Sequence, residues 1–215
     1  MAHLTSTTSC PGYPASQTTQ LNLFDLLGLP TPPSSGRRDV SPRDRTVLPT
    51  ARLASAVAEH IERGEALPAN RFFALAADFF GGTLAEGAFS ARDAYDAGEL
   101  GLHLVFHRGL AGDVANSGAG EALETIAEVE RLVTLLPSQT RRSQEQQAFQ
   151  QFSTPASYAF ACAWAAALQP GDVVLEPSAG TGALLAWPLA VARRLDLRCF
   201  ANELSERRAD LLRVL

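Results

Sequence analysis

The stretch from residue 172 to residue 203 constrains the fold more than any other part of this 215-residue chain. Residues 172–175 read Asp-Val-Val-Leu, a short apolar run that predicts a buried β-strand, and residues 197–201 predict a second strand. Between the strands lie a tight loop at residues 176–182 and a helix that begins at Ala183. This order predicts a parallel βαβ unit. We therefore expect an α/β fold built on the start of a doubly wound sheet.

An acidic residue follows each predicted strand. Glu176 opens the loop after the first strand, and Asn202 and Glu203 follow the second. The loop, called the glycine loop below, reads Glu176, Pro177, Ser178, Ala179, Gly180, Thr181, Gly182. Glycines allow the backbone to approach a ligand closely, and the N–H groups at the start of the next helix attract an anion. The unit therefore predicts a site for an adenosine-type ligand.

Two cofactors compete for such a site. An NAD site favours Gly-x-Gly-x-x-Gly directly at the strand end, whereas this loop has two glycines and an acid at that position. S-Adenosylmethionine carries an ammonium, a carboxylate and a ribose. Glu176 would meet the ammonium, the backbone at the helix start would meet the carboxylate, and Glu203 would accept from both ribose hydroxyls. The spacing favours S-adenosylmethionine, and an NAD-type oxidoreductase is the alternative.

The rest of the chain divides into three predicted regions: a disordered arm at 1–49, a small all-helical region at 50–142, and the α/β part at 143–215. The arm is rich in Ser, Thr and Pro. Its leucine-rich island at 21–27 is interpreted as a passing helical turn, or as a docking segment.

Helical spacing begins near residue 51. Leu53, Val57 and Ile61 recur at intervals of four, and Ser90 with Asp93 predicts a capping box. Further helices are expected to carry three apolar sets: Phe72, Leu75, Ala76, Phe79; Tyr95, Leu102, Val105; and Ile126, Val129, Val133, Leu136.

A second capping box is predicted at Ser143 and Gln146. Thr154 is predicted to cap a buried helix with Pro155 in its first position, and that helix ends at 169–171. Pro188 should bend the helix after the glycine loop or end its regular part.

Other side chains suggest chemistry less strongly. His103 and His107 have the spacing of a helical metal pair, but no third ligand is evident, and we predict no metal site. Asp93, Asp96 and Glu99 are interpreted as a solvated helix face rather than acid-base groups. Cys10, Cys162 and Cys199 are scattered and predict neither a disulfide framework nor a zinc site.

Charge and composition exclude several classes of function. All 18 basic residues are arginine, so the chain lacks the lysine of a P-loop and of Schiff-base enzymes. The net charge of −5 argues against a surface coated for nucleic acid, although a single basic groove remains compatible with it. No apolar run is long enough to span a bilayer, and no secretory signal is evident, so we expect a cytoplasmic protein without a membrane partner.

Two segments carry a resemblance to a known family. Residues 150–155, Gln-Gln-Phe-Ser-Thr-Pro, resemble the Gln-aromatic-x-Thr-Pro motif of DNA methyltransferases that methylate amino groups, and residues 174–182 resemble their cofactor loop. Residues 136–204, with the segments at 85–88 and 93–95, resemble the N-terminal part of bacterial strawberry-notch-like methylase/helicase proteins. The resemblance covers about residues 50 to 215.

The resemblance implies a Rossmann-like domain that binds S-adenosylmethionine and methylates N6 of adenine in DNA, with the base flipped out of a duplex. The cofactor-binding residues it implies are Phe152, Thr154, Pro155, Glu176, Pro177, Ser178, Ala179, Gly180, Thr181, Gly182, Asn202 and Glu203.

The chain also departs from that family. The Asn/Asp/Ser-Pro-Pro-aromatic loop that holds the target base is missing, so we assign no catalytic residue. Two strands are too few for a complete parallel sheet. We therefore expect the front portion of a longer methyltransferase, inactive alone. The alternative is a non-catalytic docking or nucleic-acid-binding module.

Overall fold

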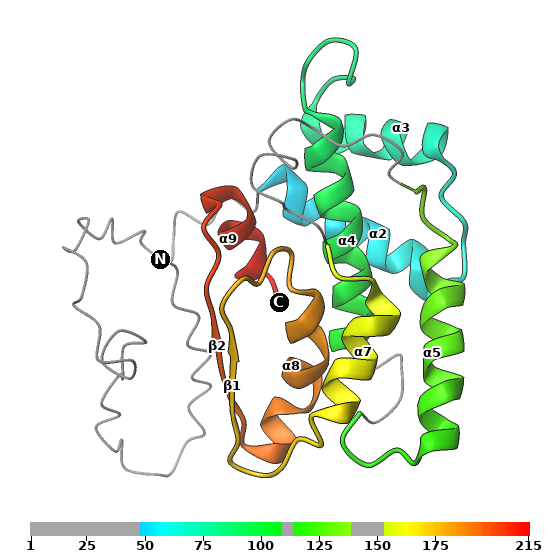
Figure 1. The fold of residues 1–215 in the computed structure, drawn as a ribbon. Helices are drawn as coiled ribbons and strands as arrows, with labels where there is room; N and C mark the ends of the chain where they lie inside the picture. The colour runs from blue at the N-terminus through cyan, green and yellow to red at the C-terminus, as the bar shows by residue number, and fades with distance from the viewer. Residues whose placement is uncertain (1–47, 109–113, 139–152) are drawn as a thin grey trace, which may run out of the picture. The chain divides into compact units, whose positions relative to one another are not determined.

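The computed structural model describes residues 48–108, 114–138 and 153–215, all of which belong to one compact unit. The described part is mixed α/β and mostly helical, with a small parallel sheet (Figure 1). Its elements are α2 (Pro49–Glu62), α3 (Ala69–Phe80), α4 (Ala91–His107), α5 (Ala119–Val133), α7 (Ala156–Ala165), β1 (Val173–Glu176), α8 (Ala183–Leu195), β2 (Arg198–Ala201) and α9 (Glu206–Leu212). Residues 1–47, which include the leucine-rich island and Cys10, and the predicted capping box at Ser143 and Gln146 lie outside the described residues.

The helical part is organised around the packing of α2 against α4. Leu53, Val57 and Ile61 are all buried, which confirms the predicted face of α2. On α4 the contact is made at Gly101, where a side chain would lie 2.8 Å from the backbone oxygen of Ala54. The two helix backbones therefore approach closely because Gly101 has no side chain.

The capping box predicted in this part is confirmed, and a glycine ends the preceding helix. Ser90 and Asp93 form the capping box that begins α4, with the Ser90 side chain accepting from the Asp93 N–H at 3.2 Å and Asp93 accepting from the Ser90 N–H at 2.9 Å. Helix α3 ends at Gly81, which adopts a left-handed conformation with φ +75°. Phe72 and Ala76 are its buried residues.

The predictions for α5 and α7 were partly wrong. In α5 the buried stripe is Ala122, Thr125, Val129 and Leu132, whereas Val133 is 42% exposed. In α7, Tyr158 is 67% exposed, because only one side of this helix packs against α5 and α8. Pro155 rather than Thr154 is the N-cap, since the first helical bond runs from the Ala159 N–H to the Pro155 carbonyl.

The sheet consists of β1 and β2 in parallel, with Val174 opposite Cys199 and Glu176 opposite Ala201. Val174 and Ala201 face α8, which covers this side of the sheet (Figure 1). On the other side Val173 is 53% exposed and Leu175 is 44% exposed. The expectation of a buried first strand is therefore wrong for one face, because no described helix covers it.

Helix α8 continues through Pro188 to Leu195, so Pro188 does not end the helix. A proline lacks the N–H that would donate to the carbonyl of Leu184, and the helix continues past this missing hydrogen bond. Trp187 and Pro188 are buried, and the Trp187 ring stacks on Phe106 of α4 with 4.7 Å between ring centres. This packing links the helical part and the α/β part in one continuous apolar core. Within the described residues, no helix has the length and apolar character needed to cross a membrane.

Replacing Gly101 by alanine tests the close approach of α2 and α4. The added methyl group would overlap Ala54 and Val57, so we expect the free energy of unfolding to fall by about 1–3 kcal/mol. Gly120→Ala in α5 is the matched control, since nothing lies within 4 Å of its added methyl group. This control should gain up to about 1 kcal/mol from helix propensity. Urea unfolding of both variants measures the difference, and equal stability changes would contradict the close approach.

Candidate functional site

The glycine loop is held at the C-terminal end of the sheet by Glu203. One carboxylate oxygen of Glu203 accepts from the Gly180 N–H at 2.8 Å, and the other accepts from the Ser205 N–H at 2.8 Å. Glu203 is only 9% exposed. Gly180 has φ +58°, a conformation that favours glycine. The carboxylate therefore fixes the turn of the loop to the end of β2.

Further hydrogen bonds join the loop to the second strand end. The Ala179 N–H donates to the Asn202 carbonyl at 2.9 Å, and the Asn202 side-chain amide donates to the Pro177 carbonyl at 3.0 Å. Within the loop, Glu176 accepts from the Ser178 N–H at 2.9 Å. The predicted juxtaposition of the two strand ends is thus present in the structure.

The segment before α7 also reaches the glycine loop. A pocket of about 30 Å³ lies between them, lined by Ser153, Thr154, Ser178, Ala179, Gly180, Thr181, Ala183, Leu184 and Arg208. Two segments that are about 25 residues apart in the sequence, predicted to belong to one site, therefore share one pocket.

The remaining predicted site residues lie outside this pocket. Gly182 faces away from it, since a side chain there would collide with Leu215 and contact Leu212. Pro155 and Pro177 are exposed, and Glu176, Asn202 and Glu203 stand at the strand ends without lining the pocket. Phe152 lies outside the described residues.

Helix α4 contacts the other side of the loop through Thr181. The His103 ring nitrogen Nδ1 lies 3.0 Å from the Thr181 carbonyl oxygen. A carbonyl oxygen only accepts, so Nδ1 carries the proton. His103 is 3% exposed, and burial lowers the pKa of its ring to about 4. A neutral His103 therefore holds the loop, and no described group of three or more potential metal ligands includes it.

Glu99 makes a second contact from α4. Its Oε2 accepts from the Thr181 hydroxyl at 2.9 Å and from the Ser153 hydroxyl at 2.7 Å. Burial, and to a lesser extent the neighbouring Asp96 carboxylate, raises the pKa of Glu99. Glu99 therefore joins the two segments that line the pocket.

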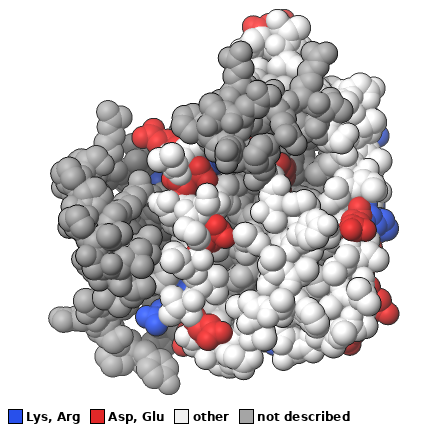
Figure 2. All heavy atoms as spheres, viewed as in Figure 1, with Lys and Arg blue, Asp and Glu red and all other residues white. Residues whose placement is uncertain are grey.

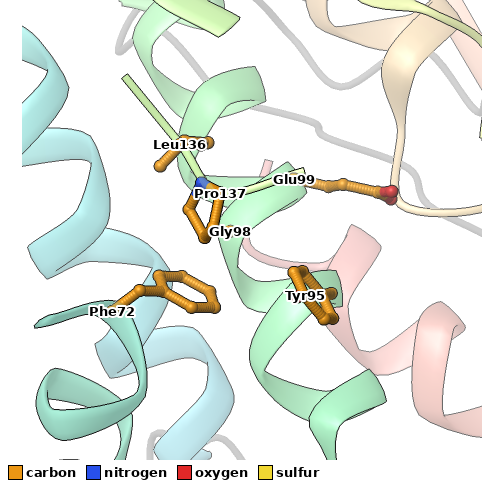
Figure 3. Close-up of a pocket in the computed structure, with 6 residues that line it drawn as sticks. All are labelled: Phe72, Tyr95, Gly98, Glu99, Leu136 and Pro137. Atoms are coloured by element: carbon orange, nitrogen blue, oxygen red, sulfur yellow. The ribbon is translucent and has the colours of Figure 1, made fainter. Parts of the chain in front are cut away.

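Glu99 also borders a second pocket of about 90 Å³ on α4. Its walls include the rings of Phe72 and Tyr95 together with Leu136 and Pro137. Figure 3 shows the Glu99 side chain extending away from the two rings. The hydroxyls that donate to Glu99, those of Ser153 and Thr181, line the first pocket, so the carboxylate is hydrogen-bonded to the wall of that pocket.

A buried ion cluster lies where α9 meets α4. Asp96 is 2% exposed and lies 2.5 Å from an Arg207 nitrogen and 3.5 Å from an Arg208 nitrogen. Arg207 also pairs with Asp93 at 3.0 Å, and Arg92 Nε lies 4.0 Å from Asp96. The interpretation as a solvated face was therefore wrong for Asp96 and Glu99, whereas Asp93 is partly exposed. Sequence reasoning also missed Arg208 as a residue that lines the pocket.

The face of the molecule in Figure 2 carries more acidic than basic side chains among the described residues. No broad basic patch is visible on the described part of that face. Cys162 and Cys199 are free thiols; Cys162 is exposed, and burial raises the pKa of Cys199 to about 11.

Comparison of the chain with protein-family models, curated proteins and solved structures finds no match.

The burial of His103 predicts a pH-dependent stability. Its pKa is about 4 in the folded state, against an ordinary value of 6.5, so between these values only the unfolded chain takes up the proton. The free energy of unfolding should therefore fall as pH is lowered from 6.5 to 4, by up to about 3 kcal/mol. His103→Asn keeps a donor near the position of Nδ1 but does not titrate, so its profile should be flatter in this window.

Urea unfolding at several pH values, followed by tryptophan fluorescence, measures both profiles. A parent profile that matches that of His103→Asn would show that His103 is not held neutral in the folded state.

Proposed function

We propose that this chain binds S-adenosylmethionine and forms the cofactor-binding portion of a Rossmann-like methyltransferase. One observation carries the proposal. Thr154 and residues 178–181 belong to the two segments that resemble methyltransferase motifs, and they line one pocket. The two segments are separated in sequence by α7 and β1. If their resemblance to the motifs were accidental, there would be no reason for them to lie side by side in the fold.

The chemistry of the pocket fits the amino-acid end of this cofactor. Its lining is polar on both sides, with the hydroxyls of Ser153, Thr154, Ser178 and Thr181. Gly180 leaves space in front of the loop, since only one side-chain nitrogen lies within 4 Å of a methyl group added there. A volume of about 30 Å³ admits a group of a few atoms, and the nucleoside would then extend over the open strand ends.

Glu203 is the proposed partner of the ribose. Each of its oxygens already accepts one backbone N–H, and a carboxylate offers about four acceptor positions in all. The carboxylate can therefore hold the loop and accept from a hydroxyl at the same time. Leu204, which is 84% exposed beside it, offers an apolar surface for the adenine ring.

The proposed acceptor is the amino group of adenine in DNA, and this part of the proposal depends on the family resemblance alone. The sequence lacks the Pro-Pro-aromatic loop that would hold the base, and the described surface in Figure 2 lacks a basic groove. The 215 residues are accordingly proposed to bind the methyl donor without transferring the methyl group.

Calorimetric titration of the chain with S-adenosylmethionine tests the proposal. We expect binding that Gly180→Val abolishes, because valine at φ +58° is strained and its side chain projects into the pocket. Gly171→Val is the matched control. Gly171 has φ +85° with nothing within 4 Å of an added methyl group, and it precedes β1 at the opposite end of the strand. This control should show similar strain but unchanged affinity.

Binding of NAD in place of S-adenosylmethionine would overturn the assignment. Absence of binding to either cofactor would instead favour a docking module built on the same fold. The exposed apolar face at Val173 and Leu175 is the feature of the described residues that such a module would use.

A further inference from the structure

We propose that Arg208 binds the carboxylate of the amino-acid part of S-adenosylmethionine. This inference rests on the proposed function and adds to it a residue that the family resemblance does not assign. It concerns the pocket lined by Ser153, Thr154, residues 178–181, Ala183, Leu184 and Arg208, in which Arg208 is the only charged residue among the described lining residues.

The backbone of the glycine loop is a poorer anion site than its sequence suggests. The N–H of Ser178 donates to Glu176, that of Ala179 to the Asn202 carbonyl, and that of Gly180 to Glu203. The N–H of Gly182 is also used, by the Ala179 carbonyl. These four N–H groups are therefore engaged within the protein. The helix-start residues Ala183 and Leu184 also line the pocket, and Arg208 is the charged donor there.

Arg208 is placed to supply that donor. One of its terminal nitrogens lies 3.8 Å from the position of a methyl group added at Gly180, so the guanidinium faces the loop across the space that Gly180 leaves. Arg208 is 3% exposed, and its Nε is buried without a hydrogen-bond partner among the described residues. A buried cation with an unused donor is costly unless an anion approaches it.

Of the two arginines in α9, Arg208 lies farther from its carboxylate partner than Arg207 does. Arg207 lies 2.5 Å from Asp96 and 3.0 Å from Asp93, whereas Arg208 lies 3.5 Å from Asp96 and has no other ion pair within the described residues. The close Arg207–Asp96 contact lacks hydrogen-bond geometry, whereas Arg208 Nη2 donates to Asp96 Oδ1, and the charge of Arg208 also acts to lower the pKa of Glu99. The guanidinium of Arg208 keeps attraction for a further anion at the pocket wall.

The size of the pocket agrees with a carboxylate. About 30 Å³ accommodates roughly two water-sized groups, which corresponds to two carboxylate oxygens rather than a ring. A guanidinium presents paired N–H donors that match those two oxygens. The shape and the charge of the pocket therefore select the same group.

Two ligands that differ only in this group test the inference. The 215-residue chain is titrated calorimetrically with S-adenosylmethionine and with decarboxylated S-adenosylmethionine, which keeps the ammonium, the sulfonium and the adenosine. The parent protein should prefer the carboxylated ligand. Arg208→Gln should weaken S-adenosylmethionine binding by roughly tenfold to a hundredfold and leave the decarboxylated ligand within about twofold, so that the preference disappears.

Arg213→Gln is the matched control, because Arg213 lies just after α9, pairs with Asp210 and does not line the pocket. It should keep the preference for the carboxylated ligand. If Arg208→Gln fails to fold, the same two titrations of Arg208→Lys test the role of Arg208. Lysine keeps the charge but loses the paired donors, so the preference should fall by about tenfold.

The outcomes separate the two proposals. If the parent binds S-adenosylmethionine and Arg208→Gln affects both ligands equally or neither, the role of Arg208 is overturned while the proposed function stands. If the parent binds neither ligand, the proposed function is overturned and the role of Arg208 with it.

Discussion

The arrangement of the site depends on the buried carboxylate of Glu203. It accepts the N–H of Gly180 and that of Ser205, so one side chain holds the turn of the glycine loop and the start of α9 together. Hydrogen bonds to an ionised carboxylate are stronger than neutral ones, and a buried N–H left without its acceptor is costly. Loss of the Glu203 side chain would leave the N–H groups of Gly180 and Ser205 without their acceptor. The pocket exists because these two elements meet.

The helical part contributes to the site as directly as the βαβ unit does. Asp96, Glu99 and His103 recur at intervals of three and four residues, which places them on one face of α4. This face meets α9 through Asp96 and the glycine loop through Glu99 and His103. Buried polar groups require partners, and here each has one on an element of the α/β part. Helix α4 is therefore a wall of the site rather than part of a separate module.

What could be predicted from the sequence was local. The capping box of Ser90 and Asp93 lies within four residues, and the Leu53, Val57 and Ile61 stripe follows from helix periodicity alone. The meeting of the two strand ends followed from the parallel βαβ rule.

What failed depended on distant partners. Glu99 binds Thr181 across 82 residues, and a carboxylate whose partner is so remote in the sequence resembles a solvated one. Thr154 is of a residue type that favours the N-cap, but in the structure it lines the pocket and Pro155 is the N-cap. Val173 and Leu175 are apolar, as in a buried strand, yet they are exposed because no described helix covers their face of the sheet.

The ion cluster between α4 and α9 explains why two adjacent arginines differ in role. Burying charges is costly, and the attraction between them recovers that cost only with close geometry. Arg207 donates to Asp93 at 3.0 Å and lies 2.5 Å from Asp96, whereas Arg208 donates to Asp96 at 3.5 Å. The next residue along the helix is turned by about 100°. Arg208 therefore lies on another side of α9, where its distance to Asp96 is longer and its guanidinium borders the pocket. An anion site needs a cation with a donor that the protein does not use, and the buried Nε of Arg208 is such a donor among the described residues.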